Sequence, residues 1–238
     1  MPAYTPVMPH SDLAEVFPDV FFVTGTSRPI HDGMQWQFSR NMTVVRDGHD
    51  LSLINTVRLD DAALAALDRL GAVRHVVKIG AFHGIDDAFY VDRYNARLWA
   101  LPGVIHESGL PTSDVLTVGG PMPFTGCSLF EWTITKVREA LLLIDRDGGI
   151  LVACDSLQNW ADADRFFDDA TAAAMRQLGF IAPTNVGPAW RQFCEPQPAD
   201  FARVLALPFR HLLSAHGPPV VGDAHARYAA TFKRLYAV

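Results

Sequence analysis

The sequence predicts an α/β fold built on mixed β-sheets, and three observations support this class. Two β-prone runs at residues 38–45 and 51–57 flank an Asp-Gly step, which is a strong signal for a β-hairpin. A helical pattern at 61–70 leads into an apolar run at 73–79, and this strand–helix–strand order favours a right-handed crossover. The second half repeats part of the pattern, because an Asp-Gly-Gly turn precedes another apolar run at 150–154.

The helix predicted at residues 61–70 has recognisable ends. Asp60 is suited to cap its N-terminus, and Gly71 is suited to stop it. Between them, leucines recur every third residue from Leu64 to Leu70, which is helical spacing. The helix is therefore expected to cover one face of the sheet.

Further apolar and amphipathic patterns continue to the C-terminus. A long amphipathic helix is expected at residues 161–178. Residues 181–198 are expected to be irregular, either as a lid or as a loop packed by its aromatic side chains. The other expected strands are at residues 20–24, 96–101, 115–118, 127–134, 139–144 and 211–214, and the other expected helices are at 89–94, 199–207 and 223–236.

Length and composition describe a chain with a substantial core. The 238 residues are 49% apolar, and we expect one domain spanning residues 1–238. No apolar run approaches the ~18 residues that a membrane-spanning helix needs, and the first ten residues lack the basic start and apolar middle of a signal peptide. We therefore expect a cytoplasmic protein that does not insert into a membrane.

Charge and cysteine content argue against two further classes. The net charge is −6 and the Lys and Arg residues are scattered, so we expect binding to neither nucleic acid nor anionic lipid. Cys127, Cys154 and Cys194 lack the spacing of a zinc knuckle, and we interpret them as reduced, mostly buried thiols. A catalytic Cys154 is the less favoured interpretation, because no adjacent cation would lower its pKa. The expected partner is a small molecule, and the sequence carries no signal for an oligomeric state.

Polar residues follow three of the predicted strands at their carboxyl ends, where ligands collect in α/β folds. His83, Asp155 and His216 each come after an apolar strand, and Asp87 lies four residues beyond His83. If the strands are neighbours in the sheet, these four side chains converge. Two imidazoles and two carboxylates suit one divalent transition metal, namely Zn, Fe or Mn, with an open position for water.

Each residue also has an ordinary structural explanation. His83 is typical of an imidazole hydrogen-bonded to backbone, Asp155 of the cap of a short turn, and His216 of a residue that holds the following Gly-Pro-Pro turn. Asp86 is a spare carboxylate that suits a general base or a partner of His83, although such an Asp more often caps a helix. The metal hypothesis therefore depends on the joint placement of the residues.

The sequence resembles the metallo-β-lactamase superfamily, the αββα sandwich hydrolases, over nearly the whole chain in order. The likeness is carried by the strand before His83, by Gly-Ile-Leu-Val-Ala-Cys-Asp at 149–155 and by Ser-Ala-His-Gly at 214–217. Residues 40–46 and 70–77 are similar to an uncharacterised bacterial branch of that superfamily. The resemblance implies a four-layer α/β sandwich, in which two mixed sheets lie face to face with helices outside.

The family signature His-x-His-x-Asp-His falls on residues 83–88 and is incomplete. His83 and Asp87 match it, whereas Ile85 and Ala88 replace two metal ligands. A two-metal site of the usual kind is therefore not expected.

The remaining ligand positions are also partly retained. A further histidine of the family has no counterpart in residues 119–126, whereas Asp155 matches the bridging carboxylate and His216 the last histidine. The resemblance thus implies one metal rather than two. Asp87, Asp155 and His216 would hold it, and His83 would complete the set or orient a water.

Two functions of different classes remain open. The first is a single-metal hydrolase of an ester, thioester, amide or phosphoester that uses metal-activated water, with Asp86 and Asp87 as candidate catalytic residues. The second is a metal-free, catalytically silent relative that binds a small molecule or a protein partner in the same cleft. The retained ligands favour the first and the missing ligands favour the second. The loops that would shape a substrate carry no pattern that identifies it.

Overall fold

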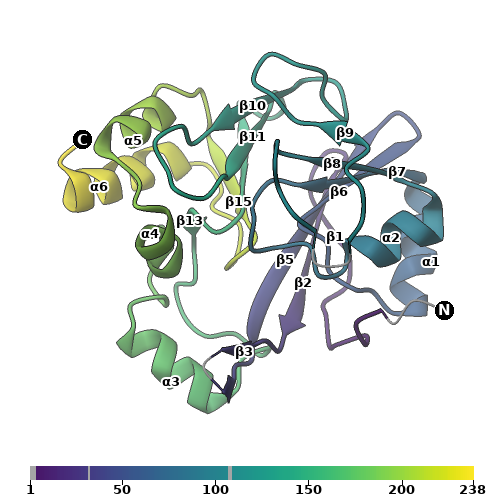
Figure 1. The fold of residues 1–238 in the computed structure, drawn as a ribbon, viewed down its shortest axis with the longest axis horizontal. Helices are drawn as coiled ribbons and strands as arrows, with labels where there is room; N and C mark the ends of the chain where they lie inside the picture. The colour runs from purple at the N-terminus through teal and green to yellow at the C-terminus, as the bar shows by residue number, and fades with distance from the viewer. Residues whose placement is uncertain (1–3, 32, 107–108) are drawn as a thin grey trace.

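The computed structural model describes residues 4–31, 33–106 and 109–238, and its larger sheet has seven strands (Figure 1). In spatial order these are β1 (Ala14–Phe17), β2 (Val20–Ser27), β5 (Phe38–Asp47), β6 (Asp50–Ile54), β7 (Ala72–Lys78), β8 (Arg97–Ala100) and β9 (Asp114–Val115). The strands from β1 to β6 pair antiparallel, whereas those from β6 to β9 pair parallel. The sheet is therefore mixed, as the hairpin followed by a crossover helix predicts.

The second sheet has four strands and is also mixed. In spatial order these are β10 (Cys127–Glu131), β11 (Ala140–Ile144), β12 (Ile150–Ala153) and β15 (His211–Ser214). β12 pairs antiparallel with β11 but parallel with β15, in a register that sets Ala153 opposite Ser214. The carboxyl ends of β12 and β15 therefore lie side by side. Two short pairs complete the strands, β3 (Ile30–His31) with β4 (Met34–Gln35) and β13 (Leu157–Gln158) with β14 (Asn185–Val186).

Helices cover the outer face of each sheet. α1 (Asp61–Leu70) and α2 (Asp87–Tyr94) lie on one side of the molecule, and α4 (Pro188–Cys194), α5 (Pro198–Leu205) and α6 (Ala224–Tyr236) lie on the other (Figure 1). α3 (Asp169–Gln177) lies beside the β3–β4 pair. This is the four-layer αββα arrangement that the sequence predicts.

Three apolar clusters separate the four layers. Successive strand residues point to opposite faces, so Val77 enters the cluster between the two sheets while Val76 enters the cluster under α1 and α2. In the same way Leu142 packs between the sheets, whereas Leu141 packs under α4, α5 and α6. Each sheet therefore buries both faces, which accounts for its near-continuous apolar strands.

Several segments differ from the sequence-based expectation. The strand expected at 115–118 is only the two-residue β9, and the strand expected at 127–134 ends at Glu131. The helix expected at 161–178 begins only at Asp169, because the Asp168 carboxylate accepts a hydrogen bond from the Thr171 amide and caps it there. Residues 181–198 contain β14 and α4, and Trp190 of α4 is 1% exposed with its ring centroid 4.9 Å from that of Trp132. This segment is therefore packed into the core by its aromatic residues. None of the described helices is long and apolar enough to cross a membrane.

Candidate metal centre

The strand ends of both sheets bring His83, Asp155 and His216 together. Asp155 follows β12 and His216 follows β15, and these two strands are parallel neighbours. The loop after β7 supplies His83 from the facing sheet. His216 Nε2 lies 3.0 Å from Asp155 Oδ1, His83 Nε2 lies 3.5 Å from Asp155 Oδ2, and the two Nε2 atoms lie 3.0 Å apart. Three of the four residues proposed from the sequence as metal ligands thus meet at one point.

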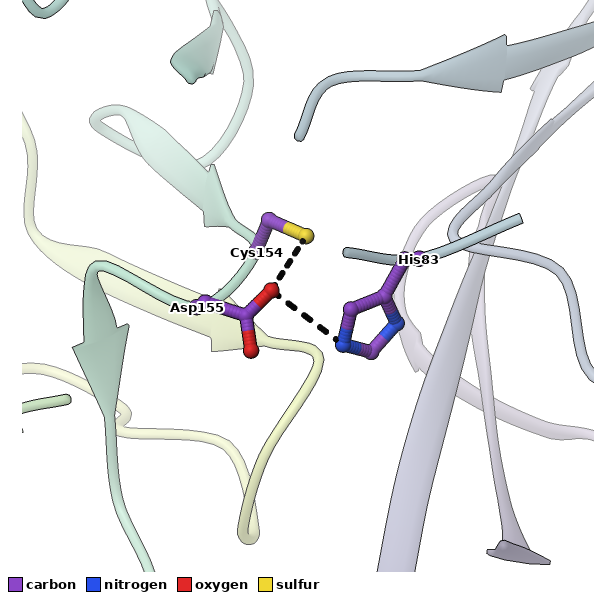
Figure 2. Close-up of side chains that lie close together, drawn as sticks. All are labelled: His83, Cys154 and Asp155. Carbon is purple, nitrogen blue, oxygen red and sulfur yellow. Dashed lines mark hydrogen bonds and ion pairs between the residues drawn. The ribbon is translucent and has the colours of Figure 1, made fainter. Parts of the chain in front are cut away.

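Cys154 belongs to the same cluster, and the sequence analysis did not assign it as a ligand. Its Sγ lies 3.3 Å from Asp155 Oδ2, and one donor atom each from His83, Cys154 and Asp155 lie within 4.8 Å of one another. Figure 2 shows the Cys154 thiol and the His83 ring directed at the same carboxylate oxygen. Cys154 and Asp155 lie in a bend after β12, so their side chains need not alternate as in a strand. The signal that could have identified Cys154 is its position directly before Asp155.

With Asp155 ionised, as its lowered pKa indicates, protons alone do not satisfy this geometry, whereas a metal cation does. A neutral imidazole nitrogen either donates or accepts a hydrogen bond, and a carboxylate only accepts. Suppose that His216 Nε2 carries a proton and donates it to Asp155. If His83 Nε2 also carries a proton, two N–H groups face each other; if it does not, its lone pair faces the Asp155 carboxylate. If His216 Nε2 accepts from His83, its own lone pair points at Asp155. Each assignment leaves one repulsive contact, but a bound cation would accept all of these lone pairs, so the donor set fits a divalent metal.

The protonation states of the cluster also suit a metal. Burial opposes ionisation of Asp155, but His83 and His216 outweigh it and hold the pKa of this carboxyl well below its usual range. Burial lowers the pKa of His216, so its imidazole is neutral at pH 7. Burial, with the Asp155 charge, raises the pKa of the Cys154 thiol well above its usual value. Cys154 must therefore lose a proton before it can act as a thiolate ligand.

A second carboxyl group, that of Glu139, lies behind the cluster and was also missed. Glu139 is 1% exposed, and its Oε1 accepts a hydrogen bond from the Ser156 amide over 2.7 Å, while Oε2 has no partner among the described residues. A Cβ added to Gly80 would lie 2.7 Å from Cys154 Sγ and 3.3 Å from Glu139 Oε2, so both atoms pack against this glycine. Burial and the nearby Asp155 raise the pKa of Glu139 well above its usual range. Glu139 therefore supports the Cys154–Asp155 bend, and its surroundings favour the neutral form of its carboxyl group.

Asp87, the fourth proposed ligand, has other partners. Its Oδ1 accepts a hydrogen bond from Thr56 Oγ1 over 2.6 Å, and its carboxylate is 1% exposed. A Cβ added to Gly84 would lie 2.6 Å from both Asp87 Oδ2 and Lys78 Nζ, so carboxylate and ammonium flank the same glycine. Burial raises the pKa of Asp87, and the charge of Lys78 opposes this effect. Ligation of a metal by Asp87 stays a prediction.

Asp86, proposed as a general base, lies 1% exposed beneath the N-terminal segment. Its Oδ2 accepts hydrogen bonds from the Arg40 guanidinium and from the Arg58 amide, and its Oδ1 accepts one from Thr5. These contacts anchor the start of α2 to β5 and to residues near the N-terminus. Both carboxylate oxygens are thus already engaged, and a catalytic role for Asp86 has no support from its surroundings.

Comparisons with known proteins support the fold. No family model and no curated protein sequence matches the chain. Among solved structures, the metallo-β-lactamase DIM-1 exposed to ceftazidime has a TM-score of 0.63 and 13% identity, covering 96% of this chain and 99% of that one.

Two further metallo-β-lactamase structures match over a similar extent. FIM-1 from Pseudomonas aeruginosa, in its mono-zinc form, has a TM-score of 0.60 and 13% identity, with 98% of each chain covered. The enzyme from Erythrobacter litoralis has a TM-score of 0.59 and 16% identity, with 96% of each chain covered. The chain therefore has the metallo-β-lactamase fold over nearly its full length, with a His/Cys/Asp cluster suited to a single metal at the carboxyl ends of its strands.

Proposed function

We propose that this protein is a single-metal hydrolase whose metal is held by His83, Asp155 and His216, with Cys154 as a fourth donor. The observation that carries the proposal is the 3.0 Å approach of the two imidazole nitrogens beside one carboxylate, which protons alone do not satisfy. The ligands come from the loops after β7, β12 and β15. The mono-zinc form of FIM-1 supports this proposal, because that protein has the same fold and was crystallised with one zinc.

The metal, when bound, would lower the pKa of a water molecule and polarise a carbonyl or phosphoryl oxygen. The chain's own groups prepare the site for this chemistry. Asp155 is ionised and His216 is neutral at pH 7, so both are ready to ligate without a change of protonation. Glu139 accepts a hydrogen bond from the Ser156 amide and so fixes the bend that carries Asp155. Of the metals predicted, zinc suits this set best, because sulfur and imidazole donors are both among its preferred ligands.

The loop that carries His83 also carries exposed apolar side chains. Phe82 is 52% exposed and Ile85 is 54% exposed, and they flank His83 in sequence. The Phe82 ring lies 6.1 Å from that of Phe193 on α4, which is itself exposed. These groups would exclude water from one side of a bound substrate and favour substrates with an apolar part next to the ester, thioester, amide or phosphoester bond.

The metal-free alternative is favoured by one observation, which is Lys78. This lysine is 4% exposed, flanks Gly84 together with Asp87, and its charge acts on the Cys154 thiol as well. The Lys78 ammonium group would keep a positive charge in the cleft of a relative that binds no metal. A silent relative would use it to bind a ligand in the same cleft.

Hydrolysis assays separate the two functions. The protein as purified, the chelator-treated protein and the zinc-reloaded protein would be assayed against nitrophenyl esters, a thioester, an anilide and a nitrophenyl phosphodiester. The hydrolase proposal expects activity on at least one class that falls at least tenfold on chelation and returns with metal. The variant Asp155→Asn should lose the hydrolytic activity. Asp61→Asn, which changes an exposed carboxylate on α1, should keep it. Activity that is unaffected by chelation, or none on any class, would favour the metal-free function.

A further inference from the structure

A cavity of about 150 Å³ lies beneath the N-terminal segment, apart from the candidate metal centre. Three arginines line it, namely Arg28, Arg40 and Arg58, together with a single carboxylate, Asp86. None of the four donors of the metal centre is among its lining residues. Three cations against one anion is an unusual balance in a chain with a net charge of −6.

The one carboxylate is already paired. Asp86 forms an ion pair with Arg40, whose side chain is 9% exposed while that of Asp86 is fully buried. Arg40 also donates to the Thr56 carbonyl over 3.1 Å, so its terminal nitrogens are occupied. Among the described residues neither Arg28 nor Arg58 has a carboxylate within ion-pair distance. The lining therefore carries two uncompensated positive charges.

Arg58 is held in place but lacks hydrogen-bond acceptors. Its Cζ lies 3.0 Å from the centroid of the Phe89 ring and 5.8 Å from that of Tyr4. Its Nε and Nη1 are buried and make no hydrogen bond within the described part of the chain. Stacking on an aromatic face uses the plane of a guanidinium and leaves its N–H donors, which lie in that plane, free for an acceptor. Arg58 is thus a cation held in place by Phe89 at the wall of the cavity.

The mouth of the cavity offers further donors. Arg28 is exposed, and its Nε donates to Gln37 Oε1 over 2.6 Å, which orients the side chain and leaves its terminal nitrogens available. Ser27, the last residue of β2, also lines the cavity. Because a water molecule takes about 30 Å³, a space of this size holds a small group rather than a whole cofactor.

We propose that this cavity is a binding site for a small oxyanion group, a phosphate or a carboxylate, held between Arg58 and Arg28. Guanidinium groups match the paired oxygens of such groups and bind them through charge-assisted hydrogen bonds. Asp86 and Arg40 form its back wall, and Ile85 links it to the loop that carries His83. The proposal does not depend on the metal or on hydrolysis.

Calorimetric titration at constant ionic strength tests the proposed oxyanion site, with inorganic phosphate, acetate and chloride as probes. Saturable binding of phosphate or acetate but not chloride is expected, and the tighter of the two identifies the oxyanion. Arg28→Gln and Arg58→Gln should each weaken it at least tenfold, whereas Arg69→Gln, which removes an exposed arginine on α1, should not. Asp155→Asn should bind as the parent does, which separates this site from the metal centre.

The result that would overturn the proposal is the absence of saturation below about 10 mM of both oxyanions, a concentration at which even weak specific sites fill. Equal weakening by Arg69→Gln would also overturn it, because the binding would then follow net charge. Loss of binding in Asp155→Asn alone would assign the anion to the metal centre instead. If Arg58→Gln fails to fold because the Phe89 stack is lost, the exposed Arg28→Gln decides the outcome.

Discussion

Lys78 places a buried amino group at the carboxyl end of β7, near the buried carboxyl group of Asp87. It is 4% exposed, and Asp87, which is 1% exposed, lies beside the same glycine, Gly84. An ionised carboxylate in such a place depends on nearby positive charge and on hydrogen bonds, here from Lys78 and Thr56. The two side chains are therefore expected to depend on each other energetically.

Replacing Lys78 with methionine should lower the free energy of unfolding by about 1–3 kcal/mol, because it removes a nearby charge that favours ionisation of the buried Asp87 carboxyl group. Urea unfolding at pH 7 measures this change. Lys233→Met, at an exposed position on α6, is the control and should change stability by less than about 0.5 kcal/mol. Adding Asp87→Asn to Lys78→Met should recover part of the loss. Equal effects of Lys78→Met and Lys233→Met would show that the pair contributes nothing.

Glu139 predicts a pH dependence of the opposite sign from that of Asp155. Because burial raises the pKa of Glu139, the folded chain keeps this group protonated at a pH where the unfolded chain ionises it. The contribution of Glu139 to the free energy of unfolding is therefore largest below pH about 4.5. It is lost as the pH rises, and the total loss is about 1.4 kcal/mol for each unit by which folding raises the pKa.

Glu139→Gln should therefore be more stable than the parent at pH 7 and nearly equal to it at pH 4, when both are compared without metal. The glutamine retains an oxygen to accept from the Ser156 amide. Chemical unfolding of chelator-treated protein at the two pH values measures the difference, with Glu15→Gln, an exposed position on β1, as the control. A destabilised Glu139→Gln at pH 7 would mean that the carboxylate is ionised and paired.

Sequence reasoning could identify the residues that follow strands at their carboxyl ends, but not Glu139, which directly precedes β11. His83, Asp155 and His216 each follow an apolar strand, and that pattern was enough to predict their convergence. Glu139 reaches the centre only because the two sheets touch at the Gly80–Glu139 bridge, where the Ala140 amide donates to the Ile79 carbonyl over 2.8 Å. Contacts of this kind have no local signature in the chain.

The loop after β15 shows how an element fixes the site. Gly217 follows His216 with φ of +89°, and a Cβ there would lie 2.2 Å from the backbone carbonyl of Asn159. The Asn159 amide donates to the His216 carbonyl over 2.8 Å, and the Asn41 side chain donates to the Gly217 carbonyl over 2.7 Å. The imidazole of His216 is therefore positioned by backbone contacts that only glycine permits.

Gly217→Ala should destabilise the protein by about 3 kcal/mol or more, since it combines an unfavourable φ with a collision against backbone. Gly222→Ala is the matched control, because its φ is +93° but nothing lies within 4 Å of the added Cβ. It should cost only about 1 kcal/mol. Thermal and urea unfolding compare the two variants. Equal losses would show that the close approach at Gly217 is relieved without cost.

The elements themselves were predictable where local signals agree. The hairpin of β5 and β6 and the helix α1 were predicted from an Asp-Gly step, a capping Asp60 and leucine spacing, and the structure has all of them. α3 is shorter than expected because Asp168 caps its N-terminus, and the residues before Asp168 form a loop. α4 was not predicted, because its seven residues owe their helical state to the burial of Trp190 against Trp132.

At the scale of the whole molecule, the centre joins the two halves of the sandwich. His83 comes from the seven-stranded sheet, whereas Asp155 and His216 come from the four-stranded sheet. A metal at this point would link the sheets from outside their shared core, and it would bind the folded chain only, since the unfolded chain separates the ligands. Metal binding and global stability are therefore expected to be coupled.

Zinc should raise the melting temperature of chelator-treated protein in a saturable manner. At a free concentration 100-fold above the dissociation constant the gain is about 2.7 kcal/mol, or roughly 5–10 °C for a chain of this size. Differential scanning calorimetry measures it, and magnesium, which prefers oxygen ligands, should have no such effect. A melting temperature that does not respond to zinc would contradict the coupling.

The metal content of the protein purified without chelators tests the central claim most directly. Elemental analysis should find about one equivalent of a transition metal in the parent and in Asp61→Asn, and less than about a tenth in Asp155→Asn. Less than about a tenth of an equivalent in the parent, or a full equivalent retained by a folded Asp155→Asn variant, would contradict it.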